Sequence, residues 1–313
     1  MRSAESRLAL IGAGRWGRNY IRTLDTLADV KLVAVASRNP ESVALVAPSC
    51  RIVADWREII ESADVDGVIV ATPPVSHAEI LIAAVDAKKP VLVEKPLVRS
   101  REEAALIRFV LDGRAATILI DHIHLFHPAF RLLLRMAPSL GPIRSIESAA
   151  GNRGSFRRDV SILWDWAPHD IAMCLALLPG LARPIRAVRL DIEWIDGAAA
   201  ETISIEIELT GGVPAQIKLS TLEERHRWFA VKFDSCTLVY RDVGPVYLTR
   251  LRPDEDVQAP GEPILVRFEQ PLSRAVLDFV DAIRLKATDR TAIDLGLAVV
   301  ELIADIDDVL GKL

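Results

Sequence analysis

The feature that most constrains the fold is a glycine-rich segment that directly follows an apolar run near the start of the chain. It reads LALIGAGRWGRNY over residues 8–20, and Gly12, Gly14 and Gly17 have the spacing G-x-G-x-x-G. Glycines with this spacing also occur in plain turns, so the pattern gains its meaning from its surroundings. Here an apolar strand precedes it and a helical pattern follows, as in the first turn of a dinucleotide-binding βαβ unit.

Short apolar runs and helical patterns alternate over roughly the first 120 residues. The apolar runs are RLALIGAG, KLVAVASR, VDGVIVATPP, PVLVEKP and ATILIDHIHLF. Helices are predicted over residues 17–28, 40–47, 56–62, 76–87 and 100–111. Runs that are apolar throughout indicate a parallel sheet covered on both faces, and their alternation with helices indicates βαβ units. This part of the chain is therefore predicted to adopt a doubly wound α/β fold.

The pattern changes in the second part of the chain, after predicted helices over 128–136 and 164–178. ETISIEIEL, residues 201–209, places Ile203, Ile205, Ile207 and Leu209 on one face, with Ser204, Glu206 and Glu208 on the other. Further short strands are expected in AQIKLS, WFAVKFDS, TLVYRDV and ILVRFE, and late helices over 271–286 and 292–310. Strict alternation indicates an antiparallel sheet with one buried face. Its other face is available for self-association, so we expect a homodimer or homotetramer.

Each glycine of the loop has an expected role toward a dinucleotide. Gly12 makes the tight turn, Gly14 lets a pyrophosphate approach the backbone, and Gly17 lets helix and strand pack closely. The N-terminus of the following helix supplies N–H groups and a partial positive charge for the phosphates. Arg15 and Trp16 are expected to contact the same cofactor. A glycine turn without a ligand, or the similar loop of a methyltransferase, are the alternatives.

The end of the second predicted strand addresses the choice of cofactor. An NAD site usually places Asp or Glu there for the ribose hydroxyls, but this chain has Ser37 and Arg38. An arginine fork suits a 2′-phosphate, and the serine hydroxyl adds a further donor. We therefore expect NADP(H) to be favoured, with NAD(H) possible. The alternative is an exposed Arg38 that merely begins a loop.

Two further segments follow strands at the edge where open α/β sheets bind ligands. ATPPVSH contains Thr72, Pro73 and His77, and VLVEKPL contains the triplet Glu94-Lys95-Pro96. A lysine at a strand end points an ammonium group into the crevice, although it can also be a solvated strand end.

A third segment, LWDWAPHDIAM, lies in the second part of the chain. It places Asp165 and His169 four residues apart, so on a helix they project from one face. Such a pair is otherwise an ordinary surface pair.

Together these motifs resemble the Gfo/Idh/MocA oxidoreductase family, which includes glucose–fructose oxidoreductase and inositol 2-dehydrogenase. The resemblance covers almost the whole chain, and GLAVVELIADI is similar to the last helix of that family. It implies an α/β protein with an N-terminal Rossmann dinucleotide-binding domain, residues 1–122. The implied C-terminal α/β domain, residues 123–313, has an open, mostly antiparallel sheet and serves substrate binding and oligomerisation. The implied C-terminal helix, about 292–310, packs back on the Rossmann domain.

The resemblance also implies roles for particular residues. Lys95, Asp165 and His169 would be catalytic and would contact the substrate, whereas Thr72, Pro73, His77, Glu94 and Lys95 would border the cofactor. Hydride transfer needs a base for the hydroxyl proton and a group that stabilises the developing alkoxide. His169 is the candidate base or acid, because its ordinary pKa is nearest neutrality, and the Lys95 ammonium would stabilise charge. The two roles are exchanged if burial makes the lysine neutral. Leu125 stands where family members often have an arginine.

Several side chains suggest the class of substrate. Arg153, Arg157 and Arg158 precede the predicted helix of Asp165, and arginines bind pyrophosphates or carboxylates by paired bonds. A solvated loop or a subunit contact explains them equally well. His122 is expected near the cleft. A metal site built on the histidines of DHIHLFH is disfavoured, since cysteines and an acidic cluster are missing beside them.

The net charge, the length of the apolar stretches and the cysteines restrict the possible partners and location of the protein. A net charge of -5 argues against a nucleic-acid partner, and no apolar stretch is long enough for a membrane span. Three scattered cysteines, Cys50, Cys174 and Cys236, indicate reduced thiols and a cytoplasmic location. The predicted function is hydride transfer between a nicotinamide cofactor and a secondary alcohol or ketone of a sugar, sugar nucleotide or cyclitol. The alternative is a non-catalytic NAD(P)-binding sensor on the same fold.

Overall fold

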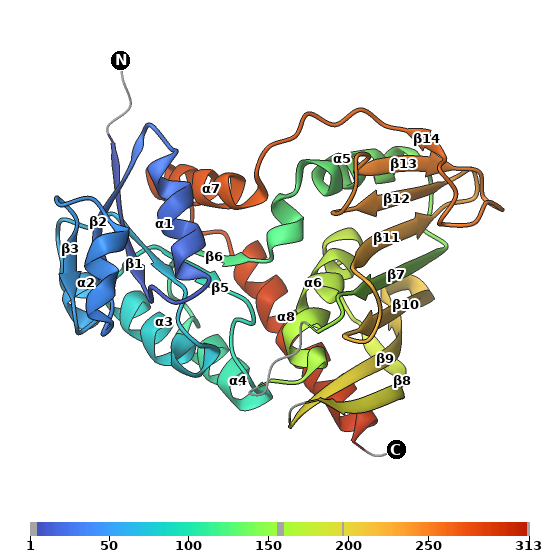
Figure 1. The fold of residues 1–313 in the computed structure, drawn as a ribbon, viewed down its shortest axis with the longest axis horizontal. Helices are drawn as coiled ribbons and strands as arrows, with labels where there is room; N and C mark the ends of the chain where they lie inside the picture. Colours follow the sequence, from blue (N-terminus) through green and yellow to red (C-terminus); the bar gives the residue numbers. More distant parts are fainter. Residues whose placement is uncertain (1–4, 155–159, 196, 312–313) are drawn as a thin grey trace. The chain divides into compact units, whose positions relative to one another are not determined.

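A computed structural model describes residues 5–154, 160–195 and 197–311, which form two compact units (Figure 1). The first unit contains the described residues up to Ile123 together with Gln270–Leu297. The second contains the described residues of His124–Glu269 and those from Ala298 onward. The C-terminal segment 270–297, which the sequence division at 122/123 assigns to the second domain, thus belongs to the first unit.

The first unit is built on a six-stranded sheet in which every neighbouring pair is parallel. Its strands are β1 (Ser6–Ile11), β2 (Val30–Ala36), β3 (Arg51–Val53), β4 (Gly67–Val70), β5 (Val91–Glu94) and β6 (Ile118–Asp121). Their order is β3-β2-β1-β4-β5-β6, so the winding direction reverses between β1 and β4. The predicted doubly wound Rossmann fold is confirmed, and the reversal marks the edge where such sheets bind ligands.

Helices cover this sheet, and one of them comes entirely from the C-terminal part of the chain. They are α1 (Gly17–Asp25), α2 (Arg57–Glu61), α3 (His77–Asp86), α4 (Arg101–Val110), α7 (Pro271–Leu285) and the start of α8 (Thr291–Leu310). Phe279 of α7 and Ile21 of α1 share one apolar cluster with Leu10 and Leu92 of the sheet. This burial places α7 in the first unit. Helix α8 begins in the first unit and ends in the second.

One predicted helix of the first unit is wrong. Residues 40–47 contain a 3-10 helix, Pro40–Leu45, in which Ser42 is the buried residue. The Asn39 side chain begins it by accepting a hydrogen bond from the Glu41 N–H, 3.0 Å. A segment that buries a single small polar side chain lacks the apolar stripe that stabilises an α-helix.

The second unit contains an eight-stranded sheet in the order β14-β13-β12-β11-β7-β10-β9-β8. The strands are β7 (Ser145–Gly151), β8 (Arg183–Ile195), β9 (Ala198–Leu209), β10 (Val213–Ser220), β11 (His226–Lys232), β12 (Thr237–Arg241), β13 (Leu248–Leu251) and β14 (Glu262–Pro263). The pair β7 and β10 is parallel and the other pairs are antiparallel. The expected open, mostly antiparallel sheet is confirmed.

Helices α5 (Pro128–Met136) and α6 (Ile162–Leu177) accompany this sheet (Figure 1). Phe130 of α5 meets Phe229 of β11 edge to face, with ring centroids 5.8 Å apart. Because β9 alternates, Ile203, Ile205 and Ile207 are all buried.

One strand prediction is wrong throughout, and another is wrong at its end. ILVRFE, residues 264–269, forms no strand, because neither of its faces is buried: Leu265 is 95% exposed and Phe268 is 47% exposed. ATILIDHIHLF does not remain extended, since β6 ends at Asp121 and Ile123–Phe126 is a 3-10 helix. A tight turn in which the His122 N–H donates to the Ile120 carbonyl, 2.8 Å, ends the strand.

The cysteines are unpaired and buried. Burial raises the pKa of the Cys50 thiol to about 11 and that of the Cys174 thiol well above its ordinary value. Both side chains are therefore neutral thiols at neutral pH. In the part of the chain that the structure describes, no helix combines the length and the apolarity needed to cross a bilayer.

Candidate functional site

The glycine loop connects β1 to α1, and its three glycines are required for different reasons. Gly12 has φ +99°, and a Cβ there would lie 2.9 Å from the carbonyl carbon of Ala71. A Cβ at Gly17 would lie 2.0 Å from the Gly12 carbonyl oxygen. Both positions therefore exclude a side chain, because rigid backbone occupies the space. A Cβ at Gly14 would meet nothing within 4 Å, so Gly14 leaves open space beside the backbone.

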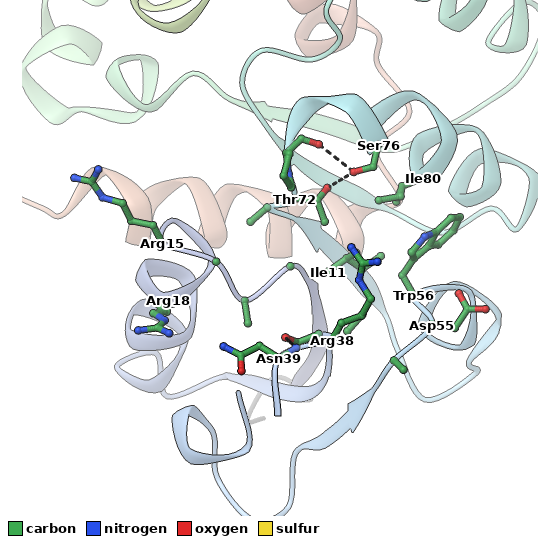
Figure 2. Close-up of a pocket in the computed structure, with 18 of the residues that line it drawn as sticks. Ile11, Arg15, Arg18, Arg38, Asn39, Asp55, Trp56, Thr72, Ser76 and Ile80 are labelled. Atoms are coloured by element: carbon green, nitrogen blue, oxygen red, sulfur yellow. Dashed lines mark hydrogen bonds between the residues drawn. The ribbon is translucent and has the colours of Figure 1, made fainter. Parts of the chain in front are cut away.

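A cavity of about 1120 Å³ lies over this turn, at the carboxyl ends of β1, β2 and β4 (Figure 2). Its size is ample for a nucleotide. The predicted cofactor residues in its wall are Gly12, Gly14, Arg15, Ser37, Arg38, Thr72 and Pro73. Arg18, Trp56 and Arg57 also line it, and sequence analysis missed them. A glycine fingerprint indicates the turn, whereas these neighbours come from the exposed face of α1 and from the segment after β3.

Arginine side chains concentrate positive charge around the cavity. Arg38 is exposed after β2 and extends toward Trp56 in Figure 2. The Ser37 hydroxyl lies 2.7 Å from the Ser42 hydroxyl and accepts from the Asn39 N–H, 3.2 Å, so it shapes the turn that presents Arg38. The guanidinium of Arg57 lies 4.3 Å from the centre of the Trp56 ring. A cavity wall with this charge favours an anionic ligand.

His77 is buried and links two loops of the sheet edge. Its Nε2 lies 3.0 Å from the Thr72 carbonyl and its Nδ1 lies 3.0 Å from the Pro96 carbonyl. Burial is the main influence on its pKa, which lies below the ordinary value, so the neutral ring donates to one of these carbonyls. The Ser76 hydroxyl donates to Thr72 Oγ1, 2.7 Å (Figure 2). His77 thus connects the cavity wall to the segment that contains Lys95 through its two ring nitrogens.

The remaining predicted cofactor residues lie apart from this cavity wall. Lys95 follows β5 and is half-buried, whereas Glu94 is buried inside the first unit. Trp16 is 42% exposed at the start of α1, and Gly17 packs against the turn itself.

In the second unit, α6 presents Asp165 and His169 from the same side, as their spacing predicts. The ring of His169 meets the ring of His124 edge to face, with centroids 5.0 Å apart. His124 Nδ1 lies 2.9 Å from the Tyr240 hydroxyl. Burial raises the pKa of Tyr240 well above its ordinary value, so the phenol stays protonated, and the tautomer of His124 sets which of the two groups donates.

Sequence analysis missed Tyr240 and did not connect His124 with His169. The three rings come from three separate segments, and only folding brings them together. Among the described residues, no cluster of His, Cys, Asp and Glu has the arrangement of a metal site.

Beside His169, Asp170 is buried and accepts a hydrogen bond from Arg227, 2.7 Å. This buried ion pair joins α6 to β11 and thereby fixes the helix that presents Asp165 and His169. Arg153 is exposed in the segment after β7. Arg157 and Arg158 lie outside the described residues.

His122, an expected substrate contact, is buried in this structure. Neither ring nitrogen has a hydrogen-bond partner among the described residues. Burial, and next the charge of Lys95, lower the pKa of His122 to about 3, and burial lowers that of His127 to about 4. Both rings are therefore neutral in the folded protein at pH 5, whereas an unfolded histidine binds a proton below its ordinary pKa of about 6.5.

The protein is consequently expected to lose stability as the pH falls below about 6.5. His122 alone contributes a loss of about 2 kcal/mol in the free energy of unfolding at pH 5. Urea unfolding at pH 7 and pH 5 measures the loss, and His122→Leu should reduce it. His226→Leu is the matched control. Equal losses in the wild type and in His122→Leu would show that His122 is protonated in the folded protein.

A glycine turn beneath an arginine-lined cavity, on a parallel sheet of this order, defines an α/β protein of the NAD-binding Rossmann class. Residues 6–112 match the sequence profile of the Gfo/Idh/MocA family, described as an oxidoreductase family with an NAD-binding Rossmann fold. A crystal structure of a proposed oxidoreductase from Magnetospirillum magnetotacticum MS-1 is 38% identical, with a TM-score of 0.88. It covers 96% of this chain and 99% of that chain. The chain belongs to the Gfo/Idh/MocA oxidoreductase family.

Relatives with named activities match to different extents. Inositol 2-dehydrogenase from Rhizobium meliloti is 25% identical over 95% of this chain and 94% of its own length. Other inositol 2-dehydrogenases, 36–40% identical, match over only 27–41% of their own length. The structure of KijD10, a 3-ketoreductase from Actinomadura kijaniata in complex with NADP and TDP-benzene, is 20% identical with a TM-score of 0.80. It covers 98% of each chain, and at that identity it shows the shared fold.

Proposed function

We propose that this protein is an NAD(P)-dependent dehydrogenase or reductase acting on a secondary alcohol or ketone of a sugar, sugar nucleotide or cyclitol. The observation that carries the proposal is the open space beside the backbone of Gly14, within a cavity lined by arginines. The names of the inositol dehydrogenases and of the 3-ketoreductase support the substrate class. A non-catalytic sensor on the same fold is disfavoured, because Lys95, Asp165 and His169 are all present.

The cavity fits a dinucleotide on two grounds. The space left by the missing side chain of Gly14 adjoins the N-terminal end of α1, whose peptide N–H groups favour phosphate. Arg15, Arg18 and Arg38 add positive charge to the same wall. A bound nicotinamide cofactor supplies the acceptor or donor of hydride.

The chain's own residues then handle the substrate and its proton. Lys95, as ammonium, donates a hydrogen bond to the reacting oxygen and stabilises the charge that develops there. His169 takes the hydroxyl proton during oxidation and returns it during reduction. Asp165, one helical turn before it, orients the substrate or the imidazole. Lys95 takes over the proton transfer if it acts as the neutral amine. Arg153 and Arg157 are proposed to bind an anionic part of the substrate.

Arg38 is proposed to select NADP(H) over NAD(H) by binding the 2′-phosphate. Arg38→Ala is expected to weaken NADPH binding about 10- to 100-fold, because a charge-assisted hydrogen bond contributes about 1.5–3 kcal/mol. NADH binding should change little. Fluorescence titration with both cofactors measures the four dissociation constants, and Arg57→Ala is the control from the same wall. Equal constants for NADPH and NADH, unchanged by Arg38→Ala, would contradict the preference.

The activity itself is tested by reduction of NADP⁺, with NAD⁺ in parallel, over a panel of inositols, sugars and sugar nucleotides. Turnover that Lys95→Ala abolishes supports a dehydrogenase and identifies its substrate class. Tight NADPH binding without turnover in either direction, with keto-sugars included in the panel, favours the sensor.

Assembly and location complete the proposal. We infer a homodimer or homotetramer formed through the second unit, and a cytoplasmic location in keeping with the free thiols. Domain roles are proposed to follow the two units, with the cofactor and Lys95 in the first, and Asp165, His169 and Arg153 in the second. Light scattering at micromolar concentration tests the assembly, and a monomer would contradict it.

A further inference from the structure

Three buried polar side chains form a cluster inside the first unit that the proposed mechanism does not use. They are Tyr20 of α1, Glu94 at the end of β5 and Asp121 at the end of β6. The Tyr20 hydroxyl donates to Asp121 Oδ2, 2.6 Å. The parallel register of β5 and β6 places Glu94 directly opposite Asp121. A phenol and two carboxyl groups therefore meet where two central strands end.

Two buried carboxyl groups on neighbouring strand ends each disfavour the ionised form of the other. Burial is the first cause that raises the pKa of Asp121, to about 6, and it raises the pKa of Glu94 well above its ordinary value. The charge of Asp121 raises the pKa of Glu94 further. Burial and both carboxyl groups raise the pKa of Tyr20, so its hydroxyl remains a donor. The pair behaves as one titrating unit.

The residue that directly follows each of the two carboxyl residues is a predicted site residue. Lys95 follows Glu94, and its positive charge favours the ionised form of both carboxyl groups. His122 follows Asp121, and the same lysine charge lowers its pKa. Among the described residues, Tyr20 from α1 and Lys95 after β5 therefore act on the pair, and His122 follows Asp121 directly.

We propose that Glu94, Asp121 and Tyr20 are positioning residues for Lys95, and that the two carboxyl groups share a single proton and present one negative charge to the lysine. The proposal rests on the proposed function in one respect, the catalytic role of Lys95. The charges of a doubly ionised pair would repel each other in the buried interior, and a doubly protonated pair would give the ammonium no counter-charge. One shared proton avoids both costs and fixes the segment from which Lys95 projects.

The shared proton has a spectroscopic signature that does not depend on activity. Infrared difference spectra at pH 7, wild type minus Glu94→Gln and wild type minus Asp121→Asn, should each contain the carbonyl band of a protonated carboxyl group, shifted in D₂O. Either substitution removes this band, because the remaining carboxyl group ionises beside Lys95. Absence of the band in both difference spectra would overturn the proposal.

The single negative charge of the Glu94–Asp121 pair is tested by comparing single and double substitutions. Each single variant retains one carboxylate, so the pH midpoint for acylation of Lys95, followed by mass spectrometry, should change little. The double variant Glu94→Gln/Asp121→Asn has none, and its midpoint should move to lower pH by about one to three units. Tyr20→Phe removes the donor to Asp121 but keeps both carboxyl groups, so its midpoint should stay closer to that of the wild type than the midpoint of the double variant, and Lys31 is the internal reference. A midpoint unchanged in the double variant would overturn the proposal.

The two readouts separate this proposal from the proposed function. If Lys95→Ala leaves turnover unchanged, the catalytic role fails, while the infrared band and the acylation midpoint still decide the proton sharing. If the double variant does not fold, the single variants decide through the infrared band alone. For the active enzyme, the single variants should retain the wild-type pH profile of kcat, and the double variant should shift its lysine-dependent limb in the same direction as the acylation midpoint.

Discussion

Replacing Lys95 with alanine is expected to lower kcat about 10²- to 10⁴-fold while leaving NADPH binding close to that of the wild type. The reason is that the ammonium acts on the reacting oxygen, where its contribution is largest in the transition state. Lys95 also lies outside the wall of the cavity that is proposed to hold the cofactor. Steady-state kinetics on the substrate identified by the panel, with fluorescence titration of NADPH, measures both quantities.

Two variants make this result specific. Lys95→Arg keeps the charge but replaces a compact ammonium with a planar fork, so it should recover only part of the lost rate. Lys31→Ala removes an exposed lysine of the same unit and should behave as the wild type. Full turnover in Lys95→Ala would exclude Lys95 from the chemistry.

Alanine at the glycines of the loop should have two opposite results. Gly14→Ala is expected to fold with an unchanged melting temperature, because its Cβ meets no atom and its φ is not positive. NADPH binding should nevertheless weaken about 10- to 100-fold, since the methyl group occupies space proposed for the pyrophosphate and hydrogen bonds to a charged group are lost. Gly17→Ala should instead destabilise the fold by about 3 kcal/mol or more, because its Cβ would overlap the Gly12 carbonyl oxygen.

Thermal unfolding and NADPH titration of both variants distinguish packing from binding. If Gly14→Ala binds NADPH as tightly as the wild type, the pyrophosphate does not lie over this turn. If Gly17→Ala melts as the wild type does, the turn relaxes far enough to accept a methyl group.

The pattern of apolar residues predicts most of the fold, because buried parallel strands and half-exposed antiparallel strands differ in sequence. Continuously apolar runs such as residues 67–70 predict the parallel sheet, and the alternation of residues 201–209 predicts the antiparallel one. The pattern fails where burial decides: ILVRFE has strand-like residues, yet no neighbour covers them. The extended prediction for DHIHLF fails for a local reason, the turn at His122, which no hydrophobic period can indicate.

The residues of the candidate site also fall into those that the sequence predicts and those that it does not. Glycine spacing and strand ends predict the cavity residues Gly12, Arg38 and Thr72, because backbone geometry connects them directly. Trp56 and the partners of Glu94 depend on which strands are neighbours and in which register. The sequence contains Glu94 in a recognisable motif, but nothing in it places Asp121 opposite.

The construction of the first unit from both ends of the chain has a consequence for biosynthesis. A ribosome completes β1 to β6 long before it completes α7, whose Phe279 and Val280 share the apolar cluster of Leu10 and Leu92. Until then the nascent nucleotide-binding half exposes part of one sheet face, the kind of surface that chaperones hold. A premature stop after residue 269 would leave that surface permanently uncovered, so such fragments should be aggregation-prone and short-lived in the cell.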